Sequence, residues 1–211
     1  VINISTGETI AVHFFSEIIK NFSLEYPDLQ FNIVARKPDS IIDDVLTNKS
    51  EIGITFTKEI PKSLKIFSQS NYPVGILCSP RHLLSGKDKV FVEDCIKFPL
   101  VFHPGTLTVW KKIQRNMGLK PFTPKPKLIA NSFALIKNYL IKDENSIAFF
   151  TKLGAVNEIN QGLLTYKTLE NDILINNKIG IVISKNKKLD FVRKKLIDEL
   201  SKQLTKYENV N

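Results

Sequence analysis

Three short segments place hydroxyl, amide or imidazole side chains where an apolar run gives way to a helical pattern. They are Thr6, Gly7, Glu8 and Thr9; His103, Gly105 and Thr106; and Asn131 with Ser132. The first turn of a helix leaves backbone N–H groups unpaired, and hydroxyl groups beside them suit a carboxylate or another anion. These turns are therefore candidate contacts for a small polar ligand.

Each of these turns also has a purely structural explanation. Threonine, serine and asparagine are common caps of helix N-termini, so Thr6, Thr9, Thr106, Asn131 and Ser132 fit that role as well. Glu8 opposes a simple anion site, because its carboxylate would repel an anion or pair with an amino group. His103 either donates to a ligand and titrates near neutrality or is satisfied within its own turn.

Five aromatic or polar residues lie near these segments in the predicted order of elements. Three of them are expected at or near strand ends, where they either line a ligand cleft or pack in the core: Phe56, Thr57 and Phe149. Trp110 and His13 lie on helix faces, which favours packing or an interface over ligand contact.

Motifs of enzymes and metal sites are missing from the sequence. It contains no G-x-S-x-G elbow, H-E-x-x-H, P-loop or G-x-G-x-x-G, and its three histidines are far apart. Cys78 and Cys95 fit neither a C-x-x-C motif nor a zinc clip, and Cys78 ends an apolar run typical of a buried thiol. We therefore expect no enzyme activity, metal or cofactor. A redox role of either cysteine stays open.

The composition is that of a globular chain with a basic surface. The 211 residues are 43% hydrophobic and carry a net charge of +9, but only four residues are arginine. Lysines are scattered and are densest at 185–188 and 193–195, which favours a solvated face over a nucleic-acid stripe. No apolar run approaches the roughly 20 residues of a membrane span, and no secretory signal precedes the first strand. Sparse thiols fit the cytoplasm.

Hydrophobic spacing predicts an α/β chain. Strands are expected at 1–5, 29–35, 52–56, 64–67, 74–78, 99–103, 127–130, 147–150, 163–167 and 179–184. Helices are expected at 9–25, from Ser40 to about residue 48, and at 106–116, 131–140 and 190–204. Residues 117–121 are expected to end the helix at 106–116. Residues 171–177 are ambiguous, because an apolar run there lies between two turn signals. The alternation indicates mainly parallel sheets covered by helices.

Two such β/α units follow one another, and turn-rich stretches near 68–72 and 170–177 are the best places for the chain to cross between them. We expect one Rossmann-like lobe from residues 1–69 plus 174–211 and a second, inserted lobe from residues 70–173. A cleft between such lobes, where strand ends and helix N-termini converge, is a natural ligand site.

Six segments in order resemble LysR-type effector-binding domains. They are YPDLQF at 26–31, LTNKSEIGI at 46–54, CSPRHLL at 78–84, VEDCIKFPLV at 92–101, SIAFF at 146–150 and KIGIVI at 178–183. Two positions depart from the family pattern, Ser146 in place of its usual glycine and Glu51 in place of its more common aspartate. The family's winged helix-turn-helix is not recognisable in these residues.

The resemblance implies a fold like type 2 periplasmic binding proteins, with a small-molecule effector in the central cleft. The family places effector contacts at the turns listed above, and its DNA contacts belong to an N-terminal domain. It also implies a cytoplasmic homodimer or homotetramer that contacts no membrane, with the first helix and helix 106–116 as interface elements.

Three other functions stay open. A solute-binding protein of a transport system would share the two-lobe design. An enzyme on this scaffold would need a catalytic cluster that the sequence does not reveal. Direct nucleic-acid binding through the basic surface would show a steep salt dependence.

Overall fold

The computed structural model describes residues 1–116, 118, 125–170 and 176–208. The chain divides into two compact units, each with its own five-stranded sheet. Unit 1 comprises Val1–Tyr72 and Asn177–Asn211, and unit 2 comprises Pro73–Asn176. The predicted second crossing, between residues 173 and 174, and most of the stop predicted at 117–121 lie outside the described residues, as does most of the ambiguous segment 171–177.

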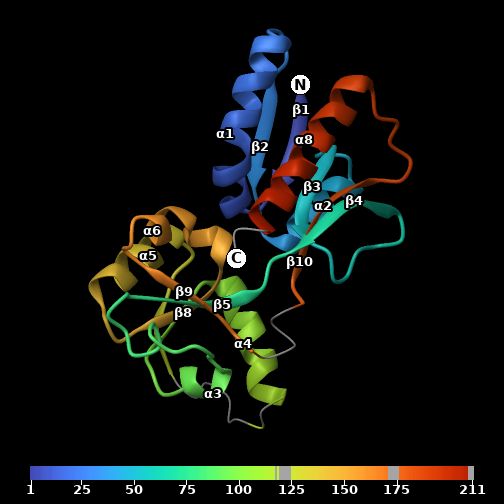
Figure 1. The fold of residues 1–211 in the computed structure, drawn as a ribbon. Coiled ribbons are helices and arrows are strands. Elements are labelled where there is room, and N and C mark those ends of the chain that lie inside the picture. Colours follow the sequence, from blue (N-terminus) through green and yellow to red (C-terminus); the bar gives the residue numbers. More distant parts are fainter. Residues whose placement is uncertain (117, 119–124, 171–175, 209–211) are drawn as a thin grey trace. The chain divides into compact units, whose positions relative to one another are not determined.

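Unit 1 is a mixed sheet with helices on both faces (Figure 1). Its strands run in the order β2-β1-β3-β10-β4, with β1, β2 and β3 parallel and β10 antiparallel to both β3 and β4. The strands are β1 (Ile2–Thr6), β2 (Phe31–Ala35), β3 (Ile52–Phe56), β4 (Leu64–Asn71) and β10 (Lys178–Ser184). The helices are α1 (Glu8–Glu25), α2 (Pro38–Leu46) and α8 (Phe191–Glu208).

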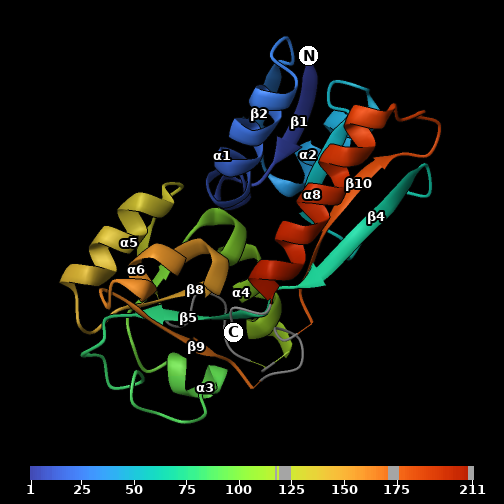
Figure 2. The same ribbon diagram turned by 45° about the horizontal axis from the view of Figure 1, so that its top comes forward.

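The two faces of this sheet are covered by different helices because strand side chains alternate in direction. Ser5 donates a hydrogen bond to Asp44 of α2, so Ser5 points to the α2 face. Ser68 bonds Ser201 of α8, and α1 lies beside α8 on this other face (Figure 2). The buried line Ile10, Phe14 and Ile18 explains why α1 forms there, since residues spaced by four share one helix face.

Unit 2 repeats the design with a second mixed sheet. Its order is β7-β6-β8-β5-β9, with β6 parallel to β7 and β8, and β5 antiparallel to β8 and β9. The strands are β5 (Val74–Cys78), β6 (Leu100–Phe102), β7 (Pro126–Ile129), β8 (Ile147–Thr151) and β9 (Thr165–Thr168). The helices are α3 (Val92–Cys95), α4 (Pro104–Asn116), α5 (Phe133–Lys142), the short 3₁₀ helix η1 (Lys152–Ala155) and α6 (Val156–Asn160).

The core of unit 2 on the α4 side is aromatic. Trp110 of α4 is 2% exposed, and its ring lies 5.3 Å from Phe149 and 5.9 Å from Phe102. The alternative that Trp110 is a packing residue is thereby confirmed. Its packing holds α4 against β6 and β8, and so fixes the turn at which α4 begins.

The elements agree with the predicted ones in kind, but several bounds differ. Ser40 is not the start of α2: Pro38 occupies the first turn and Lys37 is the N-cap, because proline is already set at a helical φ. The segment η1–α6 was not expected, since its short helices lack a long periodic pattern. The sheets are less parallel than expected, because β4, β5 and β10 run against their neighbours.

Candidate functional site

In unit 1, the carboxyl ends of the three parallel strands meet at one edge of the sheet. The amide of Arg36, just after β2, donates to the carbonyl of Thr6 at 2.8 Å, which ties the ends of β1 and β2 together. Phe56 ends β3 at the same edge and is 40% exposed. Helices α1 and α2 leave from opposite faces here, the arrangement at which open α/β sheets bind ligands.

The first turn of α1 has no side-chain cap. Its N-cap is Gly7, and the first helical bond runs from the amide of Ala11 to the Gly7 carbonyl at 3.0 Å. The preceding N–H groups have no intrahelical acceptor, as at every helix start. Open space surrounds Gly7 where a Cβ would lie, so a ligand can approach the backbone. Neither Thr6 nor Thr9 therefore caps α1, contrary to the structural explanation considered for them.

Thr6 carries an unsatisfied polar group next to this turn. Its side chain is 0% exposed, and its hydroxyl has no hydrogen-bond partner among the residues that the structure describes. Because Ser5 faces α2, alternation places the Thr6 side chain on the α1 face. Buried hydroxyls nearly always have a partner, so the bond that Thr6 lacks is open to a water or a ligand at the turn beside it.

A buried polar network fixes the strand end that presents Thr6. Ser5 donates to Asp44 at 2.7 Å and shares a 2.8 Å bond with Ser50. Asp44 also pairs with Arg36, Nε to Oδ2, at 3.4 Å. Arg36 was not in the predicted set. The signal that would have found it is its place directly after a parallel strand.

The other predicted residues of this edge differ in their surroundings. Thr57 already donates its hydroxyl to Gln69 at 2.8 Å. Glu8 is exposed in the first turn of α1, where its charge suits the helix N-terminus, and Thr9 is half-buried beside it. The turn between β1 and α1 therefore holds Thr6, Gly7, Glu8 and Thr9. Phe56 ends β3, the neighbour of β1 on the side away from β2, and Thr57 follows it.

In unit 2, the equivalent edge holds His103 in a compact turn. Its ring stacks on Phe133 at 4.3 Å, and its Nδ1 accepts the amide of Gly105 at 3.1 Å. The neutral ring therefore carries its proton on Nε2. The Thr106 hydroxyl accepts the His103 amide and donates to the His103 carbonyl from the third position of α4, so the cap of α4 is the His103 ring and not Thr106 as predicted.

The next turn of unit 2 follows β7. Ser132 caps α5 by accepting the amide of Leu135 at 3.2 Å, and Asn131 is exposed beside it. Phe149 is 2% exposed and belongs to the aromatic core, so it packs beneath the edge and does not line it. Thr151, which ends β8 at this edge, was missed because the predicted strand stopped one residue early.

The sequence of this chain matches a known protein family over nearly its whole length. The family model described as the LysR substrate binding domain matches residues 1–205. The chain belongs to the LysR substrate-binding domain family. The regulator CysB of Haemophilus influenzae is 24% identical over 143 residues, which are 66% of this chain and 44% of that protein. The chain spans about half the length of the curated relatives it matches.

Solved LysR structures share the fold. A putative LysR family transcriptional regulator from Pseudomonas aeruginosa is 14% identical, with a TM-score of 0.76 over 97% of this chain and 71% of that one. The Synechocystis PCC6803 CcmR regulatory domain in complex with 2-PG is 16% identical, with a TM-score of 0.75 over 96% of each chain. The α/β fold is therefore that of LysR regulatory domains, of the type 2 periplasmic-binding-protein class.

Membership in the LysR family bears on two of the alternatives. The matched relatives are transcription regulators, so the interpretation as a transport protein is not favoured. The relatives are likewise not enzymes. Among the described helices, none combines the length and apolar character that a bilayer span requires. No group of three or more potential metal ligands occurs within the described residues.

Both thiols of this LysR domain are buried, as predicted for Cys78. Burial raises the pKa of Cys78 to about 11 and that of Cys95 to about 12. Because the thiolate is the reactive form, we expect neither thiol to react with a disulfide reagent near pH 8 while the chain is folded. Absorbance of the released thiol should show no modification in buffer and two groups per chain in denaturant. Rapid reaction of the folded chain would contradict this.

His82 is neutral in the folded chain and holds a loop of unit 2 in place through two hydrogen bonds. It is 3% exposed, its Nδ1 accepts the Leu84 amide at 3.0 Å, and its Nε2 donates to the Asn145 carbonyl at 3.2 Å. Burial lowers the pKa of His82 below its ordinary 6.5. Below about pH 6.5, His82 therefore binds a proton more readily in the unfolded chain than in the folded chain. The free energy of unfolding falls as the pH drops through this range.

This predicts a pH dependence that belongs to His82. Urea midpoints between about pH 7.5 and pH 5 should fall for the wild type and fall less for His82→Gln, which cannot titrate. An equal pH slope in wild type and His82→Gln would show that the proton is taken up elsewhere.

Proposed function

We propose that this chain is the sensing domain of a LysR-type transcription regulator and binds a small-molecule effector at the carboxyl ends of its parallel strands. The observation that carries the proposal is the uncapped first turn of α1 beside the buried, unpartnered hydroxyl of Thr6. A ligand oxygen at this turn would satisfy backbone N–H groups, and the hydroxyl would gain the partner it lacks.

The proposed contacts are given for each unit by itself. They are Thr6, Gly7, Glu8, Thr9, Phe56 and Thr57 in unit 1, and His103, Gly105, Thr106, Asn131 and Ser132 in unit 2. Phe149 supports the edge of unit 2 from the core and is left out of the set. The complex of the CcmR regulatory domain with 2-PG supports a small molecule as the ligand class.

The remaining partners follow from the LysR family. We propose that DNA is bound by an N-terminal winged helix-turn-helix of a longer protein, which would act in the cytoplasm where the DNA is. The working form would be a homodimer or homotetramer, with α1 and α4 at the interface. Light scattering tests this assembly, and a strictly monomeric chain at high concentration would count against it.

A thermal-shift screen of the chain tests effector binding. The library should contain amino acids, organic acids, aromatic acids, phosphorylated metabolites, amines and neutral sugars. A ligand at about 100 times its dissociation constant stabilises the fold by about 2.7 kcal/mol, which raises the melting temperature by several degrees. A broad library without a stabilising compound would count against a sensing role.

Thr6→Val separates ligand contact from structure. Valine has nearly the same shape but no hydroxyl, so in the free chain it removes an unsatisfied buried group and should raise stability by about 1 kcal/mol. With the effector bound it should instead lose one hydrogen bond and weaken binding by roughly fivefold. The free chain therefore melts higher while the ligand-induced shift shrinks, as differential scanning fluorimetry would show.

Thr55→Val is the matched control. Thr55 is also buried, and its hydroxyl has no partner in the described part of the chain, but its place in β3, two residues from Gly53, turns it toward α2. It should gain stability in the same way and keep the full ligand-induced shift. Equal losses of ligand response in the two variants, or none in Thr6→Val, would contradict the placement of the effector.

A further inference from the structure

The points at which the chain leaves and re-enters unit 1 are joined to each other. The amide of Tyr72, the last residue before unit 2, donates to the carbonyl of Asn177 at 2.7 Å. The Asn177 side chain in turn donates to the Tyr72 carbonyl at 2.9 Å. These bonds continue the pairing of β4 with β10, in which Asn71 lies opposite Lys178. We name Tyr72 and Asn177 the crossing pair.

The end of α8 holds the crossing pair in place. The Tyr72 hydroxyl donates to the carbonyl of Leu204 at 2.6 Å, and the side chain is 3% exposed. The amide of Asn71 donates to a carboxylate oxygen of Glu208 at 2.9 Å. Burial raises the pKa of Tyr72, so its hydroxyl stays a donor throughout the physiological range. Both bonds reach the same last turn of one helix.

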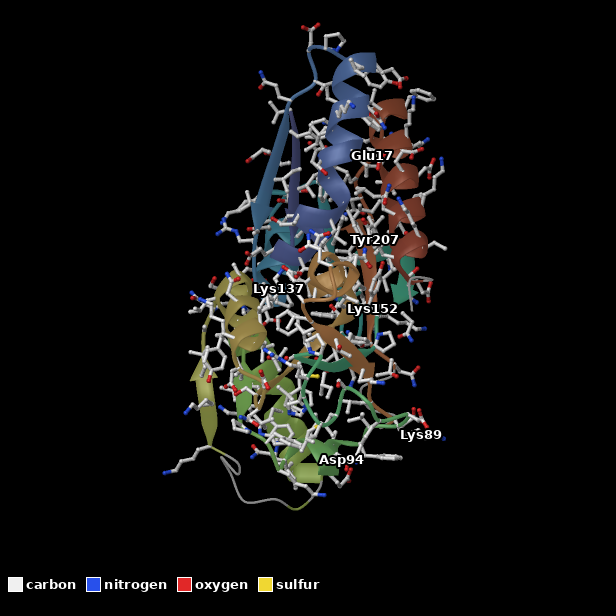
Figure 3. All side chains as sticks on the ribbon, turned by 60° about the vertical axis from the view of Figure 1, so that its left-hand side comes forward. Glu17, Lys89, Asp94, Lys137, Lys152 and Tyr207 are labelled. Carbon is white, nitrogen blue, oxygen red and sulfur yellow. The ribbon has the colours of Figure 1, made fainter. Side chains whose placement is uncertain are left out.

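The same turn of α8 also contacts α1. The ring of Tyr207 stacks on Phe14 of α1 at 5.4 Å with the planes 15° apart, and it lies 6.1 Å from the His13 ring. Figure 3 shows Tyr207 at the C-terminal end of α8, beside α1. Phe14 is buried and less than two turns from the start of α1. The last turn of α8, Leu204–Glu208, therefore touches the crossing pair on one side and α1 on the other.

We infer that Leu204–Glu208 couples the first helix to the crossing pair, with Tyr72 and Tyr207 as its positioning residues. A change in order at the first turn of α1 is transmitted through Phe14 and Tyr207 to the helix end, and from there to the strands that leave and enter unit 1. That this change follows effector binding rests on the proposed function. The coupling itself is a property of the free chain.

Coupling differs from simple anchoring because it is reciprocal. If Leu204–Glu208 only held its own neighbours, removing one of its contacts would change amide exchange only in the residues of that contact. A coupled turn predicts that cutting its contact with α1 loosens the crossing pair, and that cutting its contact with the crossing pair loosens α1. Amide hydrogen exchange reads both sides in one experiment.

Exchange is measured on the ligand-free chain in two variants. Tyr207→Leu removes the stacking on Phe14 and should speed exchange of the Tyr72 amide by roughly fivefold. Tyr72→Phe removes the bond to Leu204 and should speed exchange in the first two turns of α1 by a similar factor, about fivefold. Amides of the central strand β3 should exchange as in the wild type, which separates local opening from global unfolding.

Tyr166→Phe is the matched control. Tyr166 is another tyrosine whose hydroxyl donates to a backbone carbonyl, that of Pro73 at 2.9 Å, but it belongs to unit 2. It should leave the amides of α1 unchanged. Effects confined to the side that each variant cuts would overturn the coupling. Glu208→Ala repeats the test from the Asn71 bond if Tyr207→Leu does not fold. Because no ligand is used, failure here leaves the effector screen untouched.

Discussion

Gly75→Ala is expected to lower the free energy of unfolding of unit 2 by about 3 kcal/mol, at the upper end of overpacking costs. A Cβ at Gly75 would lie 2.2 Å from the backbone oxygen of Lys167 and 2.7 Å from the Tyr166 ring. A backbone atom cannot rotate away as a side chain does, so β9 would have to separate from β5. Gly75 pairs with Phe150 on its other side, which leaves β5 no room to shift.

Urea unfolding followed by tryptophan fluorescence measures this loss. Trp110 is the single tryptophan and lies in unit 2, so its emission reports that unit. Gly86→Ala is the control, because the space around Gly86 is open, and it should change stability by less than about 0.5 kcal/mol. A Gly75→Ala midpoint equal to that of Gly86→Ala would show that β5 and β9 are not as close as described.

Trp110→Ala should cost about 3–5 kcal/mol, the range for deleting a large buried aromatic side chain. Trp110 packs against both Phe102 and Phe149, which also stack on each other, so its removal leaves a cavity in the core of unit 2. The loss also frees α4, whose first turn carries Gly105 and Thr106 of the proposed site. Stability and effector affinity should therefore fall together.

Thermal unfolding followed by circular dichroism measures the cost, since the variants have no tryptophan. Trp110→Phe is the informative partner. The indole N–H has no hydrogen-bond partner among the described residues, so phenylalanine loses volume but no bond and should cost less than about 2 kcal/mol. Equal costs for the two variants would mean that the indole N–H, and not the packing, is what matters.

Much of the fold was predictable because a long periodic pattern of apolar residues is compatible with only one type of secondary structure. The line Ile10, Phe14 and Ile18 fixed the place of α1, and the apolar runs at β3 and β5 gave those strands with their observed bounds. Where packing overrides local pattern, prediction failed. The segment η1–α6 is held by the buried residues Leu153 and Ala155, which are too few to form a helical period.

The candidate site was predictable at its turns but not in its details. Thr6 and Ser132 look alike in sequence as caps, yet only Ser132 acts as one. The difference arises because Thr6 is the last residue of a strand whose alternation buries it, and Gly7 takes the cap position. The sequence is compatible with Phe149 in the cleft or in the core, and its contacts with Trp110 and Phe102 place it in the core.

The most direct test of the sensing role is amide NMR of the chain with the first compound from the thermal-shift screen. We predict the largest chemical-shift changes at Gly7, Glu8, Thr9 and Ile10, with a second set from His103 to Thr106. Amides around Glu17 and Lys195, in the middle of α1 and near the start of α8, should stay where they are. Binding that moves those amides and leaves Gly7–Ile10 unchanged would contradict the account.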